Sequence, residues 1–193
     1  MIPFSDEAKR QFERVAEKYR FECVAADERR VRYESTDVFL DVRFDNGRSY
    51  DLGIEIGQII PNKIERPFSL AEILRLKNVS EGCSIDGFST SSVTKLRDGL
   101  KTLADLTLNY ADDFLRGRVS SFVQVADLRE KESLAYAIQR DLRTARAKAV
   151  KAWNTKDYAG VIAAYEPVES HLEPSEVKRL QYSQSKIFPV SGS

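Results

Sequence analysis

The sequence predicts an α+β fold in which an N-terminal helix and an antiparallel β-meander pack on a C-terminal helical bundle. The first observation is an apolar stripe at helical spacing, formed by Phe12, Val15 and Tyr19. The second is an alternation of apolar and polar residues within 31–60, which is typical of half-buried strands. The third is a return to the helical period from Ser89 onward. Together they predict an α+β subdomain at residues 1–78, a linker at 79–91 and a helical subdomain at 92–188.

The clearest part of the meander is a hairpin whose apolar residues alternate along two strands. They are Val38, Leu40, Val42 and Phe44 in the first strand and Tyr50, Leu52, Ile54 and Ile56 in the second. A two-residue loop would set apolar residues of one strand opposite polar residues of the other, whereas a three-residue loop at 46–48 pairs apolar with apolar. We therefore expect Phe44 to pair with Tyr50 and Val42 with Leu52.

Caps and breaks set the limits of the helices. Ser69 and Glu72 form a capping box, because each side chain can satisfy a free backbone donor near the other residue. The spacing then predicts a long helix ended by Gly117 and a short helix over 119–128. Pro174 predicts the first turn of a last helix. Before it we expect another helix with these residues inside: Leu134, Ile138, Leu142, Ala145, Ala149 and Trp153.

The composition is that of a soluble globular chain, with 42% hydrophobic and 31% charged residues. Thirty basic and thirty acidic residues cancel, which argues against a chain built as a whole to bind nucleic acid or an anionic membrane. No apolar run approaches the ~18 residues of a spanning helix, and the N-terminus lacks a signal-peptide pattern. Cys23 and Cys83 give no disulfide framework, so we expect a cytoplasmic protein.

The residue types that most often carry chemistry are few. His171 is the chain's single histidine, and together with Cys23 and Cys83 it gives three soft ligands without metal-site spacing. A Cys-His pair is formally available, but no local motif for a nucleophile surrounds either cysteine. No Gly-rich loop leads to a Lys-Ser/Thr pair. The sequence therefore predicts no catalytic site, no metal and no cofactor.

The carboxylates of the hairpin leave one enzymatic alternative open. Asp41 and Glu55 lie on adjacent predicted strands, as do the metal-binding acids of some divalent-ion-dependent nucleases. Those sites also carry a lysine two residues after the second acid, and Gly57 occupies that position here. A solvated outer face of the sheet is the favoured interpretation, and a divergent nuclease is the least favoured function.

Two charged surfaces are candidates for binding a partner. The first is an acidic face on the hairpin, formed by Asp37, Asp41, Asp51 and Glu55. The second is a basic helix face opposite the apolar stripe, formed by Arg140, Arg143, Lys148 and Lys151. The basic face shows no obvious aromatic or amide residues of the kind that nucleic-acid binders usually add. The favoured interpretation of this face is a solvated helix face, and the alternatives are an acidic protein partner and nucleic acid. We therefore expect a protein partner, and neither nucleic acid nor a membrane.

Residues 148–174, KAVKAWNTKDYAGVIAAYEPVESHLEP, resemble the turn and second helix of a tetratricopeptide repeat. The matching elements are the small residues before the turn, Lys156-Asp157-Tyr158, Tyr165 and the closing Pro174. A single repeat cannot bury its own faces, so the resemblance implies a helical hairpin that packs on neighbouring helices.

Residues 31–57, VRYESTDVFLDVRFDNGRSYDLGIEIG, together with FSLAEILRL at 68–76, are similar to a group of small uncharacterised bacterial cytoplasmic proteins. Some of these look like immunity proteins of polymorphic toxin systems. The resemblance implies a non-enzymatic protein that neutralises a cognate toxin by occlusion. The alternative is a helical adaptor or regulatory module that binds a peptide or protein partner.

Overall fold

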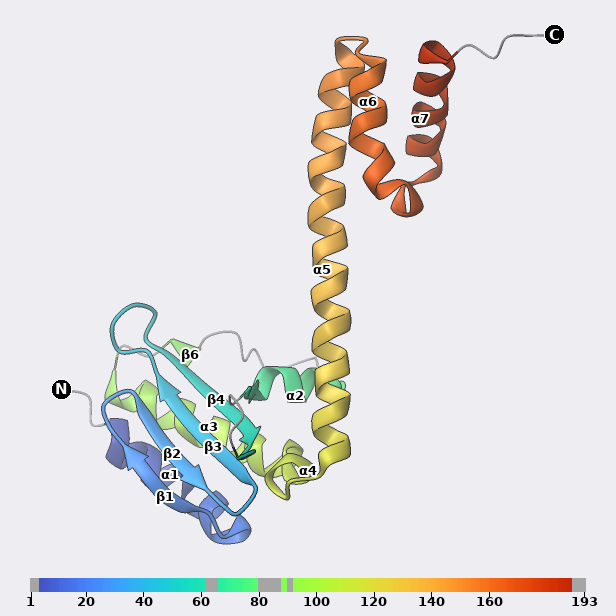
Figure 1. The fold of residues 1–193 in the computed structure, drawn as a ribbon. Helices are drawn as coiled ribbons and strands as arrows, with labels where there is room; N and C mark the ends of the chain where they lie inside the picture. The colour runs from blue at the N-terminus through green and yellow to red at the C-terminus, as the bar shows by residue number, and fades with distance from the viewer. Residues whose placement is uncertain (1–3, 62–65, 80–87, 90–91, 189–193) are drawn as a thin grey trace. The chain divides into compact units, whose positions relative to one another are not determined.

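The computed structural model describes residues 4–61, 66–79, 88–89 and 92–188, and it has the predicted α+β architecture (Figure 1). The chain divides into two compact units, residues 1–129 and 130–193. The division lies within one continuous helix, α5 (Val119–Asn154). It does not lie in the segment 79–91 interpreted from sequence as a linker, most of which falls outside the described residues.

The first unit contains an antiparallel sheet in the order β1-β2-β3-β4-β5, with β6 also paired to β4. Its strands are β1 (Glu22–Ala26), β2 (Arg30–Glu34), β3 (Val38–Phe44), β4 (Asp51–Gln58), β5 (Phe68–Ser69) and β6 (Phe88–Ser89). Because β5 and β6 pair with different parts of β4, both long edges of β4 are covered along much of their length. Strand β1 is left at the open edge of the described sheet.

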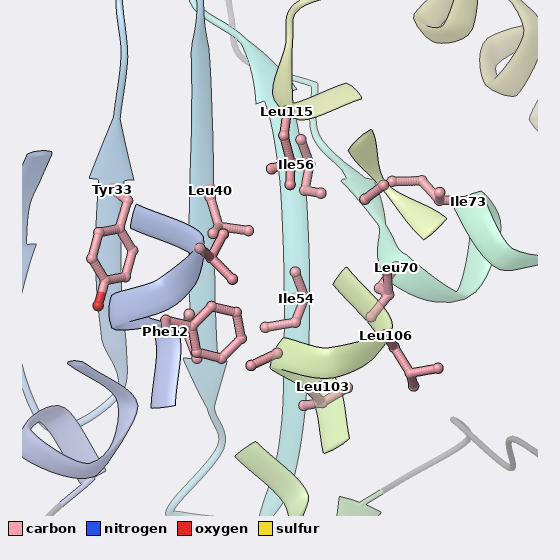
Figure 2. Packing of buried hydrophobic residues seen from close by; sticks show 14 of the residues in the cluster. Phe12, Tyr33, Leu40, Ile54, Ile56, Leu70, Ile73, Leu103, Leu106 and Leu115 are labelled. Carbon is pink, nitrogen blue, oxygen red and sulfur yellow. The ribbon is translucent and has the colours of Figure 1, made fainter. Parts of the chain in front are cut away.

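Four helices of the first unit pack with the sheet around one core. They are α1 (Phe4–Tyr19), α2 (Leu70–Leu76), α3 (Val93–Tyr110) and α4 (Asp112–Leu115). Figure 2 shows how Phe12 of α1, Ile54 of β4 and Leu103 of α3 converge in this core. Because α3 and α4 bury their apolar residues in the same cluster as the strands, the first unit extends well beyond residue 78.

The predicted faces of the hairpin are right except at Tyr50, which lies before β4 and is 43% exposed, but the predicted register is wrong by two residues. Val42 pairs with Ile54 and Phe44 with Leu52, so the loop is longer than three residues. The Asp45 carboxylate explains the longer loop, because it accepts hydrogen bonds from the backbone N–H groups of the following residues. A two-residue shift leaves every side chain on its own face, and the alternation alone therefore cannot detect it.

The predicted helix limits are only partly right. The capping box of Ser69 and Glu72 is present, and Pro174 begins the last helix. The helix predicted to run to Gly117 is broken at Ala111 into α3 and α4, and Gly117 follows α4 with φ +70°. The segment 119–128, predicted as a separate short helix, is the start of α5.

The second unit is built from the later part of α5 and a helical hairpin. The hairpin elements are α6 (Tyr158–Tyr165), the short 3₁₀ helix η1 (Glu166–His171) and α7 (Pro174–Ile187). Tyr165 and Leu180 are buried in a core otherwise lined mostly by alanines and valines. Leu134, predicted to face inward, is 62% exposed, because it lies on α5 before the stretch that packs against the hairpin.

Candidate functional site

The first predicted binding surface, on the outer face of the sheet, is a network of ion pairs. Asp41 and Glu55 are opposite each other in the β3–β4 register. Asp41 is 1% exposed, and its Oδ2 lies 3.6 Å from Nη1 of Arg32 and 3.7 Å from Nη2 of Arg43. Nε of Arg43 is 2.9 Å from Oε2 of Glu55. The acids of this face are therefore neutralised by the sheet's own arginines.

Packing on the same face holds Arg32 in place. Its guanidinium lies 4.1 Å from the centre of the buried Phe39 ring, and its Nε donates to Glu34 at 2.6 Å. The Phe39 ring in turn lies against Gly57, where a Cβ atom would meet Cζ of Phe39 at 2.5 Å. Gly57 therefore makes room for the Phe39 ring, which in turn supports the Arg32 guanidinium.

Another arginine of the first unit, Arg129, forms hydrogen bonds with residues on either side of β5. Arg129 of α5 donates from Nε to Oε1 of Glu72 at 2.5 Å and from Nη2 to the Pro67 carbonyl at 2.8 Å. Its guanidinium also covers the Phe68 ring, 4.1 Å from the ring centre. Burial alone would raise the pKa of Glu72, but the hydrogen bonds from Arg129 and Ser69 outweigh it and lower the pKa to about 2.

The pKa of Glu55 is shifted in the opposite direction to the pKa of Glu72. Burial raises the pKa of Glu55 above its ordinary value, the positive charge of Arg43 opposes the rise, and the negative charge of Asp41 adds to it. A raised carboxyl pKa beside a second acid is a feature of some catalytic sites. Here both acids are in contact with Arg43, and among the described residues no group of three or more His, Cys, Asp or Glu side chains is arranged to hold a metal ion.

The four predicted acids do not form one exposed face. Asp37 is exposed in the turn between β2 and β3, while Asp51 is half-buried at the start of β4. Asp41 and Glu55 belong to the ion-pair network described above. An approaching partner would therefore meet a mixture of cations and acids on this side of the sheet.

The second predicted surface, on α5, is exposed as expected. Arg140, Arg143, Lys148 and Lys151 are all exposed and lie opposite the buried stripe of the same helix. Arg140 pairs with its neighbour Asp141, with 3.0 Å between Nη2 and Oδ1. Within the described ranges of the chain, the other three cations form no ion pair. Their charge is therefore presented to solvent.

Two apolar residues that the sequence interpretation missed extend this surface. Tyr136 is 70% exposed about one turn before Arg140, and Val150 is 48% exposed beside Lys151. The signal was present, because helical spacing places Tyr136, Arg140 and Arg143 on one side of α5. We call the set Tyr136, Arg140, Arg143, Lys148, Val150 and Lys151 the α5 face.

Three aromatic rings pack at the turn between α5 and α6. Trp153, Tyr158 and Tyr182 form T-shaped pairs with centroid distances of 5.6 to 6.1 Å. The Arg179 guanidinium lies 5.2 Å from the centre of the Trp153 ring. This cluster connects α5, α6 and α7 and fixes the end of the helix that carries the α5 face.

The candidate nucleophile and metal ligands are divided between the two units and the undescribed part of the chain. Cys23 is exposed in β1 of the first unit, and His171 is exposed at the end of η1 in the second. Cys83 lies outside the described residues.

No helix among the described residues is long and apolar enough to cross a membrane.

Comparison of the chain with protein-family models, with curated proteins and with solved structures found no match.

Proposed function

We propose that this chain is a non-enzymatic protein-binding protein, and specifically an immunity protein that neutralises a cognate toxin by occluding the toxin's site. The observation that carries the proposal is the α5 face, where exposed tyrosine and valine side chains lie among four cations. Tyrosine and arginine are the side chains that most often dominate binding energy at protein interfaces.

The chemistry of the α5 face selects an acidic partner surface. Three of its four cations have no counter-ion among the residues that the structure describes, so they are available to a partner's carboxylates. Complementary charge speeds association and excludes partners of the wrong sign. On the acidic face, Asp41 and Glu55 are neutralised by Arg32 and Arg43. The other two acids, Asp37 and Asp51, do not form one exposed face with them, and we therefore propose α5 as the binding surface.

The test uses the full chain as bait in its native cells, with nuclease treatment and quantitative mass spectrometry. The decisive variant reverses the four cations of the α5 face to glutamate, alone and with Tyr136→Ala. The matched control reverses four exposed cations of the first unit: Arg14, Arg48, Lys95 and Lys101. Both variants change the net charge equally.

The expected result is one stoichiometric protein that survives nuclease treatment, is lost with the α5 variant and is kept with the control. Its toxicity should be suppressed by co-expression of the wild-type chain and not by co-expression of the α5 variant. A partner kept by both variants would refute the surface assignment. Loss of all partners on nuclease treatment would replace the proposal with nucleic-acid binding.

The second candidate, an adaptor that binds a peptide, is favoured by the helical hairpin of the second unit. A fragment starting at residue 89 cannot test it, because α3 and α4 belong to the core of the first unit. The discriminating measurement is whether a short acidic segment of the captured partner binds the full chain as tightly as the folded partner does. An adaptor requires equal affinities, whereas an occluding inhibitor requires the folded domain.

A further inference from the structure

A cluster of three aromatic rings in the second unit continues the α5 face onto α7. Trp153 near the end of α5 and Tyr182 of α7 form a T-shaped pair with ring centroids 5.6 Å apart, and Tyr158 packs against both rings. Val150 of the α5 face lies about one turn before Trp153 and is 48% exposed, while Tyr182 is 45% exposed. The apolar part of the exposed surface therefore does not stop at α5.

Exposed aromatic side chains are concentrated in this unit. Among the described residues, those of the second unit are Tyr136, Tyr182 and Phe188, whereas the first unit exposes Tyr50. Tyrosine, tryptophan and phenylalanine are enriched at the centre of protein interfaces, where their large apolar area is removed from water. The exposed rings therefore point to a protein partner for the second unit.

The charges of the second unit are separated between its two ends. Its glutamates lie on η1 and around the first turn of α7, and they are Glu166, Glu169, Glu173 and Glu176. Toward the opposite end, where α5 ends and α6 begins (Figure 1), lie the cations Lys151, Lys156, Arg179 and Lys186. Asp157 also lies at this end, but its carboxylate accepts the backbone N–H of Gly160 as the cap of α6. The end that carries the rings is thus positively charged.

Two of these cations lie beside the rings and restrict what can bind there. The Arg179 guanidinium is 5.2 Å from the centre of the Trp153 ring, and Nζ of Lys186 is 5.2 Å from the centre of the Tyr182 ring. Neither cation forms an ion pair within the described ranges of the chain. A cationic ligand is disfavoured, because the chain's own cations already occupy the positions over these rings. Carboxylates, in contrast, would find two uncompensated partners.

We propose that the partner of the α5 face anchors on this cluster through an aromatic side chain flanked by carboxylates. The partner's ring packs against Tyr182 and Val150, and its carboxylates pair with Arg179 and Lys186. This anchor rests on the proposed function, because it extends the α5 face and names the kind of segment that the partner presents. Aromatic rings pair favourably edge to face, and residues that dominate binding on one protein tend to meet such residues on the other.

The test uses the fluorescence of Trp153, which is the chain's single tryptophan and therefore reports on the cluster. The full chain is titrated with a short peptide of aspartate and glutamate that carries one central phenylalanine. We expect a saturable change in emission, with affinity lowered about tenfold or more by Arg179→Glu, since a like charge then faces the peptide's carboxylates. Lys178→Glu is the matched control, because Lys178 is the exposed neighbour on α7 and the charge change is the same. Tyr182→Ala should weaken binding by removing the ring contact.

A peptide that does not bind would overturn the anchor, as would equal affinities after replacing its phenylalanine by alanine or its acids by lysines. So would an effect of Arg179→Glu no larger than that of Lys178→Glu. Tighter binding of a single-stranded oligonucleotide than of the peptide would replace the anchor with nucleic-acid binding. Thermal unfolding of each variant checks that the fold is retained.

The pull-down from native cells separates this anchor from the function on which it rests. A partner that is lost with the four-cation variant of the α5 face but kept with Arg179→Glu and Tyr182→Ala combined would refute the anchor alone. A partner kept with both variants would refute the α5 surface as well. Loss of the partner with either variant, and its retention with Lys178→Glu, is the result that we expect.

Discussion

The outer face of the sheet in the first unit and the α5 face of the second unit differ in how their charges are placed. In the first unit, buried or half-buried acids such as Asp41 and Glu72 contact arginines of the same unit. In the second, the α5 face presents its cations to solvent. A charge that is satisfied internally stabilises or specifies the fold, whereas a charge left in solvent is available for recognition. The comparison therefore favours a structural role for the charges of the sheet face and is the basis on which binding is proposed for α5.

The cores differ as well. The first unit buries Phe4, Phe12 and Phe114 among many leucines and isoleucines. The second places alanines between α5 and its hairpin, with Tyr165 as its largest fully buried side chain. Alanine allows helices to approach closely but contributes little apolar area. The second unit should consequently be the less stable of the two.

The largest expected effects come from deleting one ring in each core. Phe12→Ala and Tyr165→Ala should each lower the stability of their own unit by about 3–5 kcal/mol, through lost burial and the cavity left behind. Unfolding followed by hydrogen exchange should show each loss confined to residues 1–129 or 130–193. If either substitution lowers protection equally across the whole chain, the units unfold as one and the comparison fails.

The next effect concerns pH and the Glu72–Arg129 pair. Since the pKa of Glu72 falls from 4.5 to about 2 on folding, its contribution to stability is fully present above pH 4.5 and is lost as pH falls toward 2. The shift corresponds to at most about 3 kcal/mol. Urea unfolding at several pH values should show the stability difference between wild type and Glu72→Gln shrinking below pH 4.5. In an Arg129→Gln background this pH dependence should be much weaker.

A smaller loss of stability should distinguish alanine substitutions at two glycines of β4. Gly57→Ala should destabilise the first unit by about 1–3 kcal/mol, because the new Cβ atom displaces the Phe39 ring and with it Arg32. Gly53→Ala is the matched control, since nothing lies within 4 Å of the Cβ position there. Replacing Phe39 by leucine in the Gly57→Ala chain should recover part of the loss. Equal effects at the two glycines would show that strand propensity, not the ring contact, decides the cost.

The sequence predicted those features that depend on neighbouring residues. The capping box at Ser69 and the start of α7 at Pro174 rest on local hydrogen bonding and fixed backbone geometry, and both are confirmed. The hairpin register failed because the Asp45 turn adds two residues without changing the faces. The burial of Asp41 was also missed, because its arginine partners are set by the pairing of three strands.

The predictions for the candidate site divide in the same way: features set by local spacing were predicted, and features set by packing were not. The exposed cations of α5 were predicted from helical spacing, which is a local property. Tyr136 was missed although helical spacing places it on the side of Arg140 and Arg143, because the prediction of this face rested on its cations alone.

The smallest effect on stability is expected where the effect on function should be greatest. Reversing Arg140, Arg143, Lys148 and Lys151 to glutamate should change the free energy of unfolding by less than about 1 kcal/mol, because exposed charges contribute little. Part of that change comes from Lys151, whose charge favours the C-terminal turn of α5. Thermal unfolding at low and high salt measures the change. A large salt-sensitive loss of stability would mean that these cations serve the fold, and the contrast between the two units would then have no functional meaning.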